Sequence, residues 1–173
     1  LNKLELDKVT VVTEGNAFSL RSVMSKEYLD YLAKKPNLDF LKFLFSRRCI
    51  LVEGPSEEML IKSYLSKQRG ILNDIEVISL HKGFTTMLDI WLKVNDGTSN
   101  KIGVIRDFDN QPKAKQRHEK YNSYENIYVT TTSEYTLEPE FIKTGENFEI
   151  FKKYFSKIHG WKLEDVSTPA ALA

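Results

Sequence analysis

Short apolar runs alternate with helical apolar periods along most of the chain. Residues 50–52 form a continuous apolar run, which is typical of a parallel strand covered on both faces. Similar runs predict strands at residues 75–80, 101–106 and 127–129. Apolar residues at helical spacing predict helices that start at Pro55, cover 84–94 and cover 146–159. Repeated strand–helix units predict an α/β fold with a parallel sheet and right-handed crossovers.

Two of these helices have recognisable features. The helix that starts at Pro55 is expected to stop at Gly70, because glycine commonly ends helices. The last predicted helix carries a row of aromatic residues, which we expect to point inward: Phe148, Phe151, Tyr154 and Phe155.

The first 46 residues follow a different pattern. Alternating apolar residues predict a β-hairpin within residues 1–23, with its turn at 14–16. Ser25 is expected to cap a helix that ends at 34–36, and Asn37 to open a second, buried helix that is apolar nearly all round. We interpret residues 1–46 as a connector from an upstream domain.

The remainder, residues 47–173, is interpreted as one domain of a longer polypeptide. Pro169 stands where a further helix would begin, and the sequence ends four residues later.

Composition narrows the class of protein. The 173 residues are 41% hydrophobic and carry a net charge of +1, so any basic surface must be local. No apolar run approaches the roughly 20 residues of a membrane-spanning helix. The single cysteine, Cys49, excludes an internal disulfide and a cysteine-rich zinc site, and its apolar context predicts a core position. We therefore expect a cytoplasmic protein in a reducing setting, with no membrane partner.

Acidic residues follow the predicted strand at 50–52. Glu53 stands where the strand ends, at the carboxyl edge of the sheet, where α/β proteins bind ligands. Glu57 and Glu58 fall in the first turn of the next helix, where acids complement the helix dipole. Of the two, Glu57 is the preferred metal ligand, and Glu58 is expected to be solvated.

A second acidic motif follows the strand at 101–106. Residues two apart on a strand share a face, so we expect Asp107 and Asp109 to project together while Phe108 points to the core. Two close carboxylates favour a hard cation such as Mg²⁺ or Mn²⁺. The alternative is an Asx-rich turn that merely ends the strand. If the first and third strands lie close, Glu53 shares this edge.

Other polar residues have two readings each. Glu138, after the fourth predicted strand, is either a ligand or a loop acid. Lys82, before Gly83, is a loop residue that could touch a phosphate. A basic run is either a solvated helix face or a contact to a nucleic-acid backbone, and it includes Lys113, Lys115 and Arg117. Neither a dinucleotide-binding glycine motif nor a P-loop is present.

Four motifs in order resemble a known family. They are Leu51-Val52-Glu53-Gly54-Pro55-Ser56-Glu57, Val77-Ile78-Ser79 leading to Gly83-Phe84, Val104-Ile105-Arg106-Asp107-Phe108-Asp109 and Tyr135-Thr136-Leu137-Glu138. Over residues 47–141 the chain resembles the Toprim domain. In finer pattern it is similar to the overcoming-lysogenization-defect (OLD) endonucleases, which include the Gabija-type anti-phage nucleases.

The resemblance implies a Toprim-like (Rossmann-like) α/β fold, with a central parallel sheet flanked by helices and preceded by the hairpin and helical connector. It implies two-metal cleavage of DNA with Mg²⁺ or Mn²⁺. Carried over by motif, Glu53, Asp107 and Asp109 would be catalytic. The metal ligands would be Glu53, Glu57, Asp107, Asp109 and Glu138, and the nucleic-acid contacts Lys82, Lys113, Lys115 and Arg117.

The resemblance also implies an ABC-type ATPase domain upstream, which would bind ATP, and a homo-oligomer. A family lysine after the last acidic motif would be Lys143, Lys162 or a residue beyond the sequence. Two alternatives stay open: a fragment of a primase or topoisomerase, and a non-catalytic Toprim scaffold for dimerisation or regulation.

Overall fold

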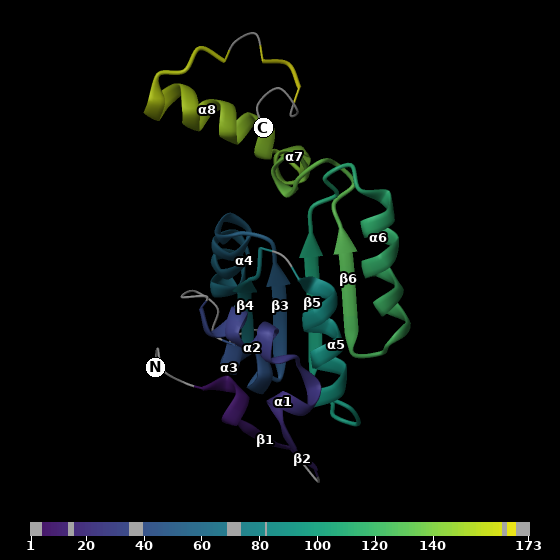
Figure 1. The fold of residues 1–173 in the computed structure, drawn as a ribbon. Coiled ribbons are helices and arrows are strands. Elements are labelled where there is room, and N and C mark those ends of the chain that lie inside the picture. Colours follow the sequence, from purple (N-terminus) through teal and green to yellow (C-terminus); the bar gives the residue numbers. More distant parts are fainter. Residues whose placement is uncertain are drawn as a thin grey trace. The chain divides into compact units, whose positions relative to one another are not determined.

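The computed structural model describes residues 5–13, 16–34, 40–68, 74–81, 83–163 and 166–168 (Figure 1). In chain order the elements are η1 Leu6–Lys8, β1 Thr10–Thr13, β2 Asn16–Ser19, α1 Leu20–Val23, α2 Lys26–Ala33, α3 Phe40–Phe45, β3 Arg48–Val52, α4 Pro55–Lys67, β4 Ile75–Ser79, α5 Phe84–Val94, β5 Lys101–Arg106, α6 Pro112–Glu119, η2 Lys120–Ser123, β6 Ile127–Thr131, α7 Leu137–Lys143 and α8 Asn147–His159.

The main sheet confirms the predicted α/β fold. Its strand order is β4-β3-β5-β6. Strand β3 pairs in parallel with β4 from Arg48↔Ile75 to Val52↔Ser79, and with β5 from Arg48↔Lys101 to Leu51↔Val104. The first and third predicted strands are therefore neighbours in the sheet. A separate antiparallel pair, β1 with β2, confirms the predicted hairpin.

The chain divides into two compact units, which we describe separately. The first comprises Leu1–Val104 and Tyr121–Tyr128, and the second Ile105–Lys120 and Val129–Ala173.

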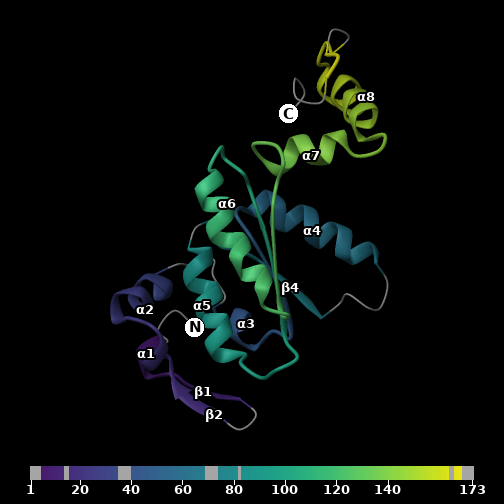
Figure 2. The same ribbon diagram turned by 90° about the vertical axis from the view of Figure 1, so that its right-hand side faces the viewer.

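In the first unit, helices cover both faces of the strands. Figure 2 shows α4 and α5 on opposite sides of them. The apolar run explains this arrangement, because Leu51 and Val52 are adjacent and both fully buried, so β3 needs cover on both faces. Trp91 of α5 is also fully buried, and its ring lies 5.6 Å from that of Phe43 in α3. Helix α3 is thereby packed against α5.

The amino-terminal predictions hold in part. Ser25 caps α2 by accepting a hydrogen bond from the Tyr28 amide at 3.2 Å, as predicted. Helix α3 is not buried all round, because Phe45 is 60% exposed. Several predictions fall wholly or partly outside the described residues, among them the turn at 14–16, the helix end at 34–36, the helix start at Asn37, the helix stop at Gly70 and the helix from Pro169.

The second unit corrects two predictions. Helix α7 was not predicted from the sequence. The predicted inward face of α8 is wrong, because α8 has no buried residue and Tyr154 is 53% exposed. Phe151 contacts Phe141 of α7 with ring centroids 5.9 Å apart, and Phe155 stacks on Trp161, beyond the end of α8, with ring centroids 4.8 Å apart.

Cys49 is a core residue, as predicted. It is buried on β3, and burial raises the pKa of its thiol to about 12, with a further contribution from the charge of Glu76. Among the described residues, no helix combines the length and the apolar character needed to cross a membrane.

Candidate functional site

Glu53 directly follows β3 in the first unit. Its carbonyl oxygen accepts a hydrogen bond from the His81 amide at 2.7 Å, and the Val52 carbonyl accepts one from Leu80 at 2.8 Å. The segment after β4 therefore continues the parallel ladder past the end of β3. This pairing fixes the Glu53 backbone at the carboxyl end of the strand, and its side chain is partly exposed.

Glu57 has a structural role at the start of α4. Its Oε2 atom accepts a hydrogen bond from the Gly54 amide at 2.8 Å, which caps the helix. A Cβ atom on Gly54 would lie 2.9 Å from the same oxygen, so the contact favours glycine. The Glu57 side chain is buried, and its role as a metal ligand stays a prediction.

The prediction that Glu58 is solvated is wrong. Its carboxylate accepts a hydrogen bond from the Ser79 amide at 3.1 Å and pairs with Lys62 at 2.5 Å. Burial opposes ionisation of this carboxyl, but the bonds from Lys62 and Ser79 outweigh it and lower the pKa. Glu58 therefore links α4 to the end of β4 by a hydrogen bond.

The second acidic motif lies in the second unit and forms a turn. Strand β5 ends at Arg106, so the strand alternation expected for Asp107 to Asp109 does not apply, and Phe108 is only half-buried. Asp109 and Asn110 have φ values of 49° and 54°, and the Gln111 amide donates to the Phe108 carbonyl at 2.8 Å. Two successive left-handed residues inside such a bond are typical of a type I′ turn, which favours Asp and Asn.

Hydrogen bonds hold this turn to the segment after β6. The Asp109 amide donates to the Tyr135 carbonyl at 3.0 Å. The Phe108 amide donates to Oγ1 of Thr132 at 2.9 Å, and the Thr132 amide donates to the Arg106 carbonyl at 3.0 Å. The backbone around Asp107 and Asp109 is therefore fixed by the loop that follows β6.

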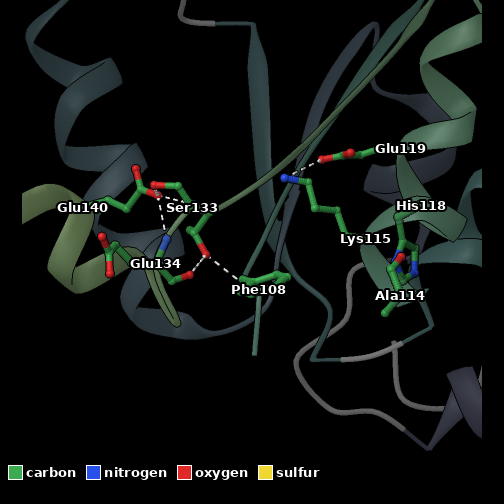
Figure 3. Close-up of polar contacts among 9 residues, drawn as sticks. Phe108, Ala114, Lys115, His118, Glu119, Ser133, Glu134 and Glu140 are labelled. Atoms are coloured by element: carbon green, nitrogen blue, oxygen red, sulfur yellow. Dashed lines mark hydrogen bonds and ion pairs between the residues drawn. The ribbon is translucent and has the colours of Figure 1, made fainter. Parts of the chain in front are cut away.

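The same loop is attached to α7. Glu140 accepts hydrogen bonds from the Ser133 amide and, at 2.7 Å, from the Ser133 hydroxyl; the Glu134 amide donates to the same oxygen at 3.2 Å (Figure 3). The bonds from Ser133 are the main cause that lowers the pKa of Glu140. Glu138, the predicted ligand, is exposed in the first turn of α7.

Sequence reasoning missed both Thr132 and Glu140. The available signal was the polar run Thr130-Thr131-Thr132-Ser133 directly after the apolar strand, since hydroxyl side chains there often bond to nearby backbone. Nothing in the local sequence indicated that Glu140, seven residues after Ser133, accepts hydrogen bonds from the amides of Ser133 and Glu134.

The predicted basic contacts lie on α6, with one exception. Lys113 and Arg117 are exposed, whereas Lys115 is partly buried and lies 3.9 Å from Glu119 (Figure 3). Lys82 is outside the described residues. Lys143, one candidate for the family lysine, forms an ion pair with Glu134.

His118 on the same helix is buried, which the sequence did not reveal. Its Nδ1 atom lies 2.7 Å from the Ala114 carbonyl, which can only accept, so Nδ1 carries the proton (Figure 3). Burial is the main cause that lowers the pKa of His118 below 6.5. The positive charges of Arg106, Arg117 and Lys120 act in the same direction, and the bond to Ala114 opposes them.

This pKa predicts a loss of stability in mild acid. The unfolded chain takes up the His118 proton near pH 6.5, whereas the folded chain takes it up only at lower pH. The free energy of unfolding should therefore fall as the pH drops below 6.5, with a slope of at most about 1.4 kcal/mol per pH unit from this group. Urea unfolding between pH 5 and 7.5 measures the slope, which His118→Met should reduce. An equal slope in both proteins would contradict the assignment.

Comparison with known proteins identifies a family for one segment of the chain. Residues 44–109 match the family model described as overcoming lysogenization defect protein-like, TOPRIM domain. This segment is an OLD-like Toprim domain. It runs from the end of α3 to Asp109 and so contains both Glu53 and the Asp107–Asp109 turn. Comparisons with curated proteins and with solved structures found no match. The match indicates a Toprim-type function, namely cleavage of nucleic acid.

Toprim domains generally bind divalent metals, and the acids of this Toprim domain supply the carboxylate oxygens that hard cations prefer. Among the residues that the structure describes, no group of three or more His, Cys, Asp and Glu side chains is arranged to hold a metal ion. The donor chemistry therefore fits a divalent cation, and the ligand set stays a prediction.

Proposed function

We propose that the OLD-like Toprim domain acts as a Mg²⁺- or Mn²⁺-dependent DNA endonuclease. The observation that carries the proposal is the family match, which contains both acidic motifs. Further support comes from where the acids stand in the chain: Glu53 directly follows β3, and Asp107 directly follows β5. In α/β folds the carboxyl ends of such strands are the usual place for ligands.

In this proposal the carboxylates of Glu53, Asp107 and Asp109 are metal ligands, and one of them is the general base. Glu57 would contribute only the oxygen that does not cap α4, and Glu138 would serve a second cation. When bound, two divalent cations would supply a nucleophilic water near neutral pH and offset charge on the scissile phosphate.

The exposed cations of α6 would bind the DNA backbone. Lys113 and Arg117 are exposed and four residues apart on this helix, so they share a face, whereas Lys115 is partly buried. Each phosphate neutralised by a cation makes the affinity more dependent on salt. Binding by these residues should therefore weaken steeply between about 50 and 200 mM salt.

A plasmid-nicking assay tests the proposal. The protein is incubated with supercoiled DNA and Mg²⁺, Mn²⁺ or EDTA, and the relaxed and linear products are quantified. We expect nicking with either metal and none with EDTA. Metal binding without any cleavage would favour a non-catalytic scaffold instead. The upstream ATPase domain, the homo-oligomer and a role in anti-phage defence stay predictions that rest on the resemblance alone.

A further inference from the structure

We propose that Thr132 is a positioning residue for the Asp107–Asp109 turn, and that Glu140 extends the same hydrogen-bonded network to α7, the helix that carries Glu138. The inference rests on the proposed function, because it assigns these two residues to the placing of carboxylates that would bind metal. Thr132, Glu140 and the three predicted ligands Asp107, Asp109 and Glu138 all belong to the second unit.

Thr132 takes part in this network through both its hydroxyl and its amide. Its side chain is buried, its Oγ1 accepts from the Phe108 amide at 2.9 Å, and the same hydroxyl donates to the Glu134 carbonyl at 2.8 Å. Its amide donates to the Arg106 carbonyl at 3.0 Å. The side chain therefore connects the acidic turn to the loop after β6, and the amide of the same residue adds the end of β5.

The Phe108 amide explains why a hydroxyl is needed. This amide lies between the two aspartates, beyond the end of β5, where no strand partner takes it. A backbone donor in a partly buried position requires an acceptor. Thr132 provides this acceptor while the residues around Asp109 remain a turn. A strand at this position would not allow the left-handed conformation of Asp109.

Glu140 completes the connection from the other side. A single carboxylate oxygen accepts the amides of Ser133 and Glu134 and the Ser133 hydroxyl (Figure 3). Glu138 lies two residues earlier on the same helix. The three predicted metal ligands of the second unit, Asp107, Asp109 and Glu138, thus stand on two segments. One continuous series of hydrogen bonds joins these segments, and the bond from the Asp109 amide to the Tyr135 carbonyl closes it.

Such a network matters for metal binding because ligand positions must be precise. Productive sites hold their groups to within about 0.5 Å, and groups that orient metal ligands typically change affinity or activity about 10- to 100-fold when removed. An acid that moves with a loosened turn would bind the cation less well even though its carboxylate is intact.

Thr132→Val tests the inference, with Thr131→Val as its matched control. Both substitutions remove one buried hydroxyl from the same strand end, but Oγ1 of Thr131 has no hydrogen-bond partner among the described residues. The measurements are amide hydrogen exchange at Phe108 by NMR, the Kd for Mn²⁺ and the nicking rate. We expect Thr132→Val to speed Phe108 exchange and to weaken Mn²⁺ binding about 10- to 100-fold. Thr131→Val should change neither the Phe108 exchange rate nor the Mn²⁺ affinity. Thr132→Ser, which keeps the hydroxyl, should leave both near the wild-type values.

The outcomes separate this inference from the proposed function. Unchanged Phe108 exchange and Mn²⁺ affinity in Thr132→Val would overturn it. If Thr132→Val does not fold, Glu140→Gln replaces it and should speed exchange at Ser133 and Glu134 while weakening Mn²⁺ binding; no change in either quantity would overturn the inference equally. If the wild-type protein neither binds Mn²⁺ nor nicks DNA, the proposed function fails, and Phe108 exchange alone decides whether Thr132 holds the turn.

Discussion

Asp107→Asn and Asp109→Asn should each lower metal-dependent nicking of plasmid DNA roughly 100-fold or more, the scale on which enzymes lose rate when one preorganised electrostatic group is removed. Asparagine keeps the shape of the side chain but loses the charge that attracts a divalent cation. Initial nicking rates at saturating Mg²⁺ and Mn²⁺ measure the effect. Glu53→Gln should behave in the same way, because it removes the charge of the side chain while the backbone hydrogen bond to His81 keeps residue 53 in place.

The choice of asparagine at position 109 is important. Asp109 has a φ of 49°, a conformation that asparagine adopts readily and alanine does not. Asp109→Asn therefore retains the turn, and lost activity can be attributed to the carboxylate. Asp96→Asn is the matched control, because Asp96 is an exposed acid in the loop after α5. Full activity in Asp107→Asn, with unchanged unfolding, would refute the catalytic assignment.

The sequence predicted the parts of this fold that depend on local pattern. The apolar run at 50–52 identified β3, because a strand buried on both faces leaves a continuous apolar stretch. Pro55 at the first position of α4 and Ser25 at the cap of α2 were also predictable, since each follows from the unpaired amides of a helix start.

What failed depends on contacts between distant segments. The strand alternation expected through Asp109 was wrong, and the alternative of an Asx-rich turn is confirmed. The Phe108 amide in this turn bonds to Thr132, 24 residues away. The contact of Glu58 with Ser79 likewise spans 21 residues. Amphipathic spacing correctly predicted that α8 is a helix. Periodicity shows only which face of a helix is apolar and not how deeply that face is buried.

Trp91→Ala and Phe43→Ala should each lower the free energy of unfolding by about 3–5 kcal/mol, the usual cost of truncating a buried aromatic side chain. Both side chains are fully buried, and their rings are 5.6 Å apart. A double-mutant cycle should give a coupling of about 0.5–1.5 kcal/mol for the pair. Urea unfolding followed by circular dichroism measures all four proteins without relying on the fluorescence of Trp91.

Phe45→Ala is the matched control, since Phe45 lies on the same helix but is 60% exposed, and its effect should stay within about 0.5 kcal/mol. The comparison also tests the predicted boundary at residue 46. If α3 is only a connector, Phe43→Ala should resemble Phe45→Ala. If α3 forms part of the core that supports β3 and Glu53, Phe43→Ala should resemble Trp91→Ala, and a fragment that starts at residue 47 would leave the Trp91 ring without its Phe43 contact. The packing of Phe43 against Trp91 favours the second result.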